Sequence, residues 1–214
     1  MSQQPTVFVV DDDPAVRDSL RLLLESVGLV AETFASPHQF LDAIVSEQPG
    51  CVLLDIRMPG MSGLELQRRL VARGITMPVI IITGHGDVTT AVQAMKTGAT
   101  DFLEKPFNDQ VLLDRIHDAI TRDTQSRRAR AEQDTVGRHL ATLSPREVEV
   151  LDLIIAGKAN KVIALDLGIS EKTVEAHRAR AMDKMQVRST ADLVRTVLLY
   201  RTSRTSTDVF PETA

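Results

Sequence analysis

Short apolar runs alternate with amphipathic helical stretches over the first 120 residues. The runs cover residues 7–10, 30–34, 51–54, 79–82 and 102–104. Their lengths, and the helical periodicity between them, indicate buried parallel strands joined by helices. The helices are expected from residue 14, near 37–46, 64–73 and 88–97, and from about residue 109. This alternation predicts an α/β domain in which five βα units form a doubly wound parallel sheet.

Residues 139–200 carry helical signals only. Ser144-Pro145-Arg146-Glu147 is a capping box that opens a helix ending near Gly157. Short helices are predicted at 161–167 and 171–185, with Gly168 in the turn and Ser170 as the second N-cap, followed by a helix at about 190–200. Two short helices around a glycine turn predict a helix-turn-helix within a small all-α domain of four helices.

The stretch between these regions is charged and has no apolar periodicity. It predicts a linker, partly helical as a continuation of the preceding helix. The expected domains are therefore residues 5–121, a linker at 122–138, a helical domain at 139–202 and a flexible tail at 203–214.

Composition narrows the class of protein. The 214 residues include a single cysteine, which rules out an internal disulfide, and no apolar run approaches the roughly 18 residues of a membrane span. The first residues do not resemble a signal peptide. We therefore expect a cytoplasmic protein without a membrane partner. The net charge of −4 hides an acidic first half, so nucleic-acid binding needs local clusters of basic residues.

Polar residues follow four of the predicted strands. Asp11-Asp12-Asp13, Asp55, Thr83 and Lys105 each stand at the carboxyl end of an apolar run. Ligands of open parallel sheets bind at those ends, so these side chains should converge. Carboxylates suit Mg²⁺, a carboxylate can form an aspartyl phosphate, and lysine binds phosphate as a point charge. The set predicts phosphoryl transfer onto Asp55, with Asp13 as a helix cap before Pro14.

Both halves resemble parts of two-component response regulators of the FixJ/NarL type. Residues 6–120 resemble a flavodoxin-like receiver domain through Asp11-Asp12, Asp55, the 58–63 loop, Thr83 and Lys105-Pro106, and the 83–87 segment is most similar to the FixJ branch. Residues 139–200 resemble the LuxR-type helix-turn-helix through 143–147, 164–170 and 172–178. Each of these short motifs is weak evidence by itself, but their occurrence in this order along the chain is specific to the family.

The resemblance implies a role for each matching residue. Asp11, Asp12, Asp55 and the backbone carbonyl of Arg57 would hold Mg²⁺. Asp55 would accept the phosphoryl group from a sensor histidine kinase, and Mg²⁺ and Lys105 would neutralise its oxygens.

Two further residues would transmit the effect of phosphorylation at Asp55. Thr83 would bind a phosphoryl oxygen, and Phe102 would turn inward as Thr83 moves, although a lone Phe on a strand is usually a core residue. The Lys105–Pro106 bond is expected to be cis. His85 lies near the site in sequence, with an ordinary loop histidine as the equal alternative.

Helix 171–185 is expected to read DNA. Val174, His177, Ala181 and Met185 share the face that should pack on the domain. The opposite face, which should enter the major groove, carries Lys172, Glu175, Ala176, Ala179 and Arg180, and phosphate contacts are expected from Lys172, Thr173, Arg178 and Lys184. Glu175 departs from the basic residue that many relatives carry there.

These features predict a DNA-binding response regulator, a transcription factor switched by phosphorylation of Asp55 and not an enzyme. Its expected partners are a sensor histidine kinase, double-stranded DNA and a second copy of the chain, with RNA polymerase as a further candidate. Two alternatives stay open. One is a Mg²⁺-dependent phosphohydrolase, which lacks support because Arg57 stands where a second acid/base carboxylate is needed. The other is an RNA- or protein-binding module, for which residues 139–200 offer Tyr200 as their only aromatic residue.

Overall fold

The computed structural model describes residues 4–44, 48–84 and 88–207. The chain divides into two compact units, Met1–Arg128 and Ala129–Ala214, which are considered separately. In the described parts of the chain, no helix has both the length and the apolar character that a membrane span requires.

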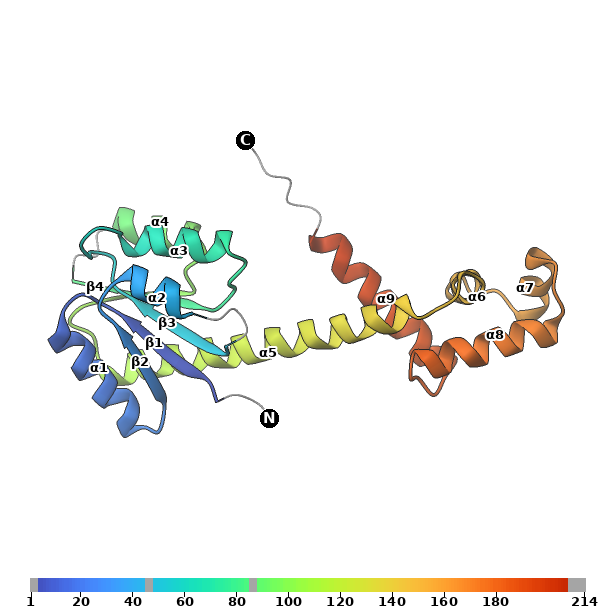
Figure 1. Cartoon of the computed structure of the whole chain (residues 1–214), viewed down its shortest axis with the longest axis horizontal. Coiled ribbons are helices and arrows are strands. Elements are labelled where there is room, and N and C mark those ends of the chain that lie inside the picture. The colour runs from blue at the N-terminus through green and yellow to red at the C-terminus, as the bar shows by residue number, and fades with distance from the viewer. Residues whose placement is uncertain (1–3, 45–47, 85–87, 208–214) are drawn as a thin grey trace. The chain divides into compact units, whose positions relative to one another are not determined.

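The first unit is a parallel sheet with helices on both faces (Figure 1). All strand pairs are parallel, and the strand order is β2-β1-β3-β4-β5. The strands are β1 (Thr6–Val10), β2 (Val30–Phe34), β3 (Gly50–Leu54), β4 (Val79–Thr83) and β5 (Asp101–Glu104). The helices are α1 (Pro14–Ser26), α2 (Pro37–Ala43), α3 (Gly63–Ala72), α4 (Val88–Lys96) and α5 (Asp109–Ala141). The predicted doubly wound sheet is confirmed.

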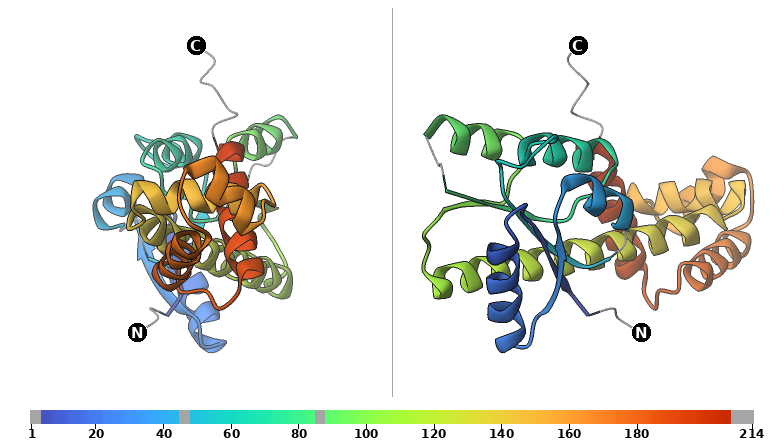
Figure 2. Two further views of the ribbon diagram at one scale, coloured as in Figure 1. Left: turned by 90° about the vertical axis from the view of Figure 1, so that its right-hand side faces the viewer. Right: turned by 60° about the vertical axis from the view of Figure 1, so that its left-hand side comes forward.

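Alternate side chains of the central strands pack into two hydrophobic cores, one on each face of the sheet. Val7 and Val9 of β1 pack with α1 and α5 on one face, whereas Phe8 and Val10 pack with α2, α3 and α4 on the other. Figure 2 shows these two helical layers on opposite sides of the sheet. Because strand side chains alternate between faces, a strand buried on both sides is apolar along nearly its whole length, as β1 is from Val7 to Val10 and β3 from Cys51 to Leu54.

Local signals place the loops at the carboxyl edge of the sheet. Asp13 caps α1 by accepting a hydrogen bond from Ala15 N at 2.8 Å, which confirms its predicted capping role. Gly63 opens α3 so close to the end of β3 that a Cβ there would lie 2.1 Å from the carbonyl oxygen of Asp55. Glycine at this position lets α3 start directly against the strand end that carries Asp55.

The charged stretch 122–138 is helical throughout, as a continuation of α5. The sequence pattern predicted only partial helix there, because a helix without an apolar stripe gives no periodic signal. Its first part belongs to the sheet unit and its end to the second unit.

Up to residue 207, where the described part ends, the second unit contains the end of α5 and four further helices. These are α6 (Pro145–Ile155), α7 (Asn160–Leu167), α8 (Glu171–Lys184) and α9 (Thr190–Thr207). Gly168 ends α7 in a left-handed conformation, and Ser170 caps α8, so the predicted helix-turn-helix is present. Helix α9 runs into the stretch expected as a tail, of which residues 208–214 lie outside the described part.

Glu147 connects the start of α6 with the end of α8. Its carboxylate accepts hydrogen bonds from Ser144 N at 2.8 Å and from Lys184 Nζ at 2.7 Å, and Ser144 Oγ accepts one from Glu147 N, which completes the predicted capping box. The Lys184 ammonium and the Ser144 backbone N–H hold the pKa of Glu147 at about 2. Hydrogen bonds to the charged form favour ionisation.

This network predicts how the second unit responds to acid. Because the pKa of Glu147 is lower in the folded state than its ordinary value of 4.5, its stabilisation is complete above that value and is lost as the pH falls towards 2. Glu147→Gln should lower the free energy of unfolding by about 1–2 kcal/mol at pH 7 and should flatten its pH dependence in that range. Urea denaturation of the full chain, followed by the fluorescence of the single tyrosine, Tyr200, reports on this unit because the chain has no tryptophan.

Exposed Glu149, on the same helix, provides the matched control as Glu149→Gln. A Glu147→Gln protein with the wild-type acid profile would contradict this role of the carboxylate.

Candidate functional site

Three charged side chains from three different strand ends meet at the carboxyl edge of the sheet. Asp11 follows β1, Asp55 follows β3 and Lys105 follows β5. Lys105 Nζ donates hydrogen bonds to Asp11 Oδ2 at 2.6 Å and to Asp55 Oδ1 at 3.1 Å. The convergence predicted from the sequence is therefore observed for these residues.

Burial makes this cluster electrostatically sensitive. Asp11 and Asp55 are only 1% and 6% exposed. Burial raises the pKa of Asp55 and outweighs the lowering by Lys105, while the nearby charge of Asp11 raises it further. Burial alone would lower the pKa of Lys105, but its bonds and attraction to Asp11 and Asp55 raise it overall. Lys105 therefore stays an ammonium between two carboxylates.

Backbone groups orient the two carboxylates. Asp11 Oδ1 accepts a hydrogen bond from Asp13 N at 2.9 Å, and Asp55 Oδ2 accepts one from Arg57 N at 2.6 Å. Arg17 was not singled out from the sequence, yet its guanidinium donates to the carbonyl oxygen of Asp11 at 2.7 Å. Its position one turn into the helix after the aspartates is the signal that would have found it.

The other expected site residues occupy varied environments. Asp12 is exposed beside the cluster, and Thr83 is buried at the end of β4. Phe102 is half-buried and packs against the core that contains α3 and α4. The Lys105–Pro106 bond is cis, as expected. His85 lies outside the described residues.

The oxygen donors at this edge of the sheet are of the chemical type that binds a hard divalent cation. Within the described parts of the chain, no three His, Cys, Asp or Glu side chains are grouped so as to hold a metal ion. Two buried carboxylates nevertheless share one ammonium, which leaves a net negative charge, and exposed Asp12 follows directly. Carboxylate and carbonyl oxygens are the ligands that Mg²⁺ prefers, together with water, so the residues present are compatible with it.

Helix α8 has the two predicted faces. Val174, Ala181 and Met185 are buried and His177 is half-buried, which confirms the packing face. The residues expected to approach bases are all exposed: Lys172, Glu175, Ala176, Ala179 and Arg180. Exposed Thr173 shares a hydrogen bond with Ser170, the N-cap of α8.

Two of the cations expected at phosphates are bound within the protein. The guanidinium of Arg178 donates to Asn160 Oδ1 at 2.6 Å and to Thr190 Oγ1 at 2.5 Å, which ties α8 to the starts of α7 and α9. Lys184 binds Glu147 and the carbonyl oxygen of Thr142. Both side chains are half-buried, so they have a structural role that the sequence pattern did not reveal.

Two family descriptions match the chain. Residues 7–117 match the response regulator receiver domain, and residues 141–197 match the bacterial regulatory proteins of the luxR family.

Similar proteins extend over nearly the whole length. The chain is 50% identical over 199 residues to the transcriptional regulatory protein FixJ of Azorhizobium caulinodans, covering 93% of this chain and 94% of that protein. It is 48% identical over 193 residues to the transcriptional regulatory protein TdiR of Thauera aromatica, covering 90% and 85%. Among solved structures, the response regulator StyR is 49% identical with a TM-score of 0.86, covering 92% of this chain and 100% of that one. Full-length FixJ from B. japonicum is 43% identical with a TM-score of 0.58, covering 94% and 99%.

The charge cluster predicts an effect of removing its ammonium. In Lys105→Met, the pKa of Asp55 should rise further, because the hydrogen bond and attraction that lower it are lost while burial and Asp11 still raise it. A ¹³C NMR titration of the Asp55 carboxyl carbon measures this pKa. Lys96→Met, at an exposed position on α4, is the control. A pKa of Asp55 that stays the same or falls in Lys105→Met would show that the ammonium does not govern this carboxylate.

Proposed function

Since the chain belongs to the response regulators that join a receiver domain to a LuxR-type DNA-binding domain, we propose that Asp55 is the phosphoacceptor that switches it. The observation that carries this proposal is the ammonium of Lys105 bridging the buried carboxylates of Asp11 and Asp55. The cluster carries a net negative charge, so it is suited to accept a phosphoryl group when a divalent cation and the ammonium of Lys105 together neutralise that group.

Each residue of the cluster has its own part in the proposed phosphoryl transfer. A carboxylate oxygen of Asp55 forms the new bond to phosphorus, while the bond from phosphorus to the imidazole nitrogen of the kinase histidine breaks and that nitrogen keeps the electron pair. The N–H of Arg57 holds the other Asp55 oxygen in place. Lys105 is near enough to exchange Asp11 for a phosphoryl oxygen.

Mg²⁺ would be held by Asp11, Asp12, Asp55 and the backbone carbonyl of Arg57, and when bound it supplies neutralisation of phosphoryl charge. Asp12 is exposed, so solvent can reach this side of the charge cluster.

Switching is proposed to start at Thr83 and Phe102. Thr83 ends β4, and Phe102 lies on the neighbouring strand β5, where it pairs with Ile81. A phosphoryl group on Asp55 would draw the Thr83 hydroxyl towards it, and Phe102 would move into the space released. The helix after Thr83, α4, exposes Val92 and Met95, which provide an apolar face for dimerisation. Such a change is a local charge event that biases a bistable element.

The proposed DNA interface is the exposed face of α8. Glu175, Ala176 and Ala179 would lie towards the base edges, with Glu175 able to accept from a cytosine amine. Lys172 and Thr173 would lie towards phosphates, and Arg180 would enter the major groove with the residues that face the bases. Arg178 and Lys184 stay in the proposed set, but each must first give up the partners described above. A dimer would match two half-sites on double-stranded DNA.

The domain limits proposed for function are 5–121 for the receiver, 122–138 for the linker, 139–202 for the DNA-binding domain and 203–214 for the tail. The proposed partners, a sensor histidine kinase and chromosomal DNA, support a cytoplasmic location. RNA polymerase is a further candidate partner there. We propose no turnover of free phosphate esters, because Arg57 stands two residues after Asp55, where such an enzyme needs an acid or base.

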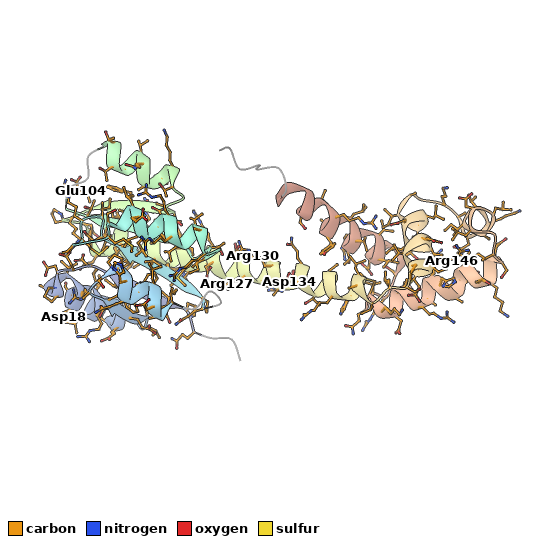
Figure 3. The ribbon with its side chains drawn as sticks, turned by 45° about the horizontal axis from the view of Figure 1, so that its top comes forward. Asp18, Glu104, Arg127, Arg130, Asp134 and Arg146 are labelled. Atoms are coloured by element: carbon orange, nitrogen blue, oxygen red, sulfur yellow. The ribbon has the colours of Figure 1, made fainter. Side chains whose placement is uncertain are left out.

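The phosphoacceptor is tested by Asp55→Asn. Treated with acetyl phosphate and Mg²⁺, the wild-type chain should gain one phosphoryl group and dimerise, whereas Asp55→Asn should do neither because its amide is a poor nucleophile. Intact mass spectrometry and light scattering measure the two outcomes. Asp18→Asn, an exposed carboxylate on α1 labelled in Figure 3, should behave as wild type. Undiminished phosphorylation of Asp55→Asn would refute the assignment.

The DNA interface is tested by removing exposed charged side chains from α8 one at a time. Lys172→Ala should weaken duplex binding at every sequence by about tenfold and reduce the salt slope by about one, because it removes a phosphate contact. Arg180→Ala should also reduce the salt slope, because it removes a positive charge from the face that enters the major groove. Glu175→Gln should instead change the preferred base. Fluorescence anisotropy at several salt concentrations separates these effects, with Lys158→Ala on the α6–α7 turn as the control. An unchanged salt slope in both α8 variants would exclude this face.

A further inference from the structure

Asp123 is buried in a stretch that the sequence predicts as a solvated linker. Asp123 is only 3% exposed, although it lies on the charged part of α5 and is followed by arginines at 127 and 128. Arg127, labelled in Figure 3, stands one helical turn further along the same helix. A buried carboxylate is costly unless it is paired and hydrogen-bonded, so its partners indicate why it is there.

One oxygen of Asp123 serves two donors. Asp123 Oδ2 accepts from Gly50 N at 3.0 Å and from Arg127 Nε at 2.7 Å. Gly50 is the first residue of β3 and is 73 positions away in sequence. The carboxylate therefore joins the linker part of α5 to the amino end of a central strand.

The backbone at position 50 requires glycine. Gly50 has φ = +149°, and a Cβ at this position would lie 1.9 Å from the carbonyl oxygen of Thr6 on β1. Its N–H donates to the carboxylate of Asp123. A buried backbone N–H without an acceptor is strongly unfavourable. Asp123 supplies the acceptor for the buried N–H of Gly50.

An ordinary helix pair does not explain this arrangement. An Asp–Arg pair at i and i+4 stabilises an exposed helix slightly, but it needs neither burial nor a distant backbone donor. Here the side chains of Asp123 and Arg127 are 2% and 22% exposed. The adjacent thiol reflects the same environment, because burial and the charge of Asp123 raise the pKa of Cys51 to about 12.

We propose that Asp123 and Arg127 are positioning residues that clamp the linker helix to β3, and that phosphorylation-dependent DNA binding requires this clamp. The strand that begins at Gly50 ends at Leu54, directly before Asp55. The clamp lies in the last turns of the first unit, which ends at Arg128. It keeps the start of the linker helical and attached to the strand that carries the phosphoacceptor, so that a change in the receiver is passed to a formed helix and not to a loose tether. The signalling part rests on the function proposed for Asp55.

The test uses the full chain with Asp123→Ala and Asp123→Asn, and Asp118→Ala as the control at an exposed aspartate of the same helix. Hydrogen exchange is measured first, without phosphorylation. In Asp123→Ala, the Gly50 amide and the α5 amides of residues 121–128 should exchange at least about tenfold faster, with β1 still protected. Asp123→Asn should recover part of this protection, because its amide oxygen still accepts from Gly50 N.

Phosphorylation and DNA affinity are measured next. Phosphate uptake from acetyl phosphate should stay within about twofold of wild type in Asp123→Ala, whereas the gain in duplex affinity on phosphorylation should fall by about threefold or more. Wild-type exchange at Gly50 in Asp123→Ala would overturn the clamp. Faster exchange with an unchanged gain in affinity would overturn its role in signalling. A wild-type chain that takes up no phosphate would instead refute the function proposed for Asp55, and the exchange result would still decide whether the clamp exists.

Discussion

The ammonium of Lys105 between two buried carboxylates is the interaction on which the site depends. Asp11 and Asp55 carry like charges next to each other at the edge of the sheet, and Lys105 reaches both. Without a cation, two buried carboxylates would repel and one would take up a proton. The same balance makes the site responsive, because a ligand that brings negative charge competes with the carboxylates for the ammonium.

Sheet topology explains why these residues meet. In the order β2-β1-β3-β4-β5, strands β1 and β3 are neighbours and the connections on either side of them run in opposite directions. The carboxyl ends of the strands at this switch point open a crevice where ligands bind in doubly wound folds. Asp11 and Asp55 follow these two strands, and Gly63 lets α3 begin directly against the carbonyl oxygen of Asp55. The chemistry is therefore positioned by backbone geometry and then adjusted by burial.

Sequence reasoning succeeded where a feature has a short-range signal. Apolar runs defined the strands, capping residues such as Ser144 and Ser170 defined helix starts, and the polar residue after each strand defined the cluster. It did not find contacts between distant residues that lie away from the carboxyl ends of the strands. Gly50 and Asp123, or Glu147 and Lys184, show no periodicity that pairs them.

The sequence does not show when a side chain also has a structural role. Arg178 and Lys184 have the charge and the position expected for phosphate contacts, yet both are held by protein partners. The length of α5 was underestimated because a charged helix has no apolar stripe to reveal it. The residue types identify the chemistry of the site, whereas the contacts that position its parts require the fold.

Mapping the covalent product tests the central claim most directly. The full chain is treated with acetyl phosphate and Mg²⁺, the acyl phosphate is trapped by borohydride reduction, and the modified residue is found by tandem mass spectrometry. The account predicts reduction of the Asp55 side chain and of no other carboxylate. Modification at Asp11, Asp12 or another residue, or no trapped product, would contradict it.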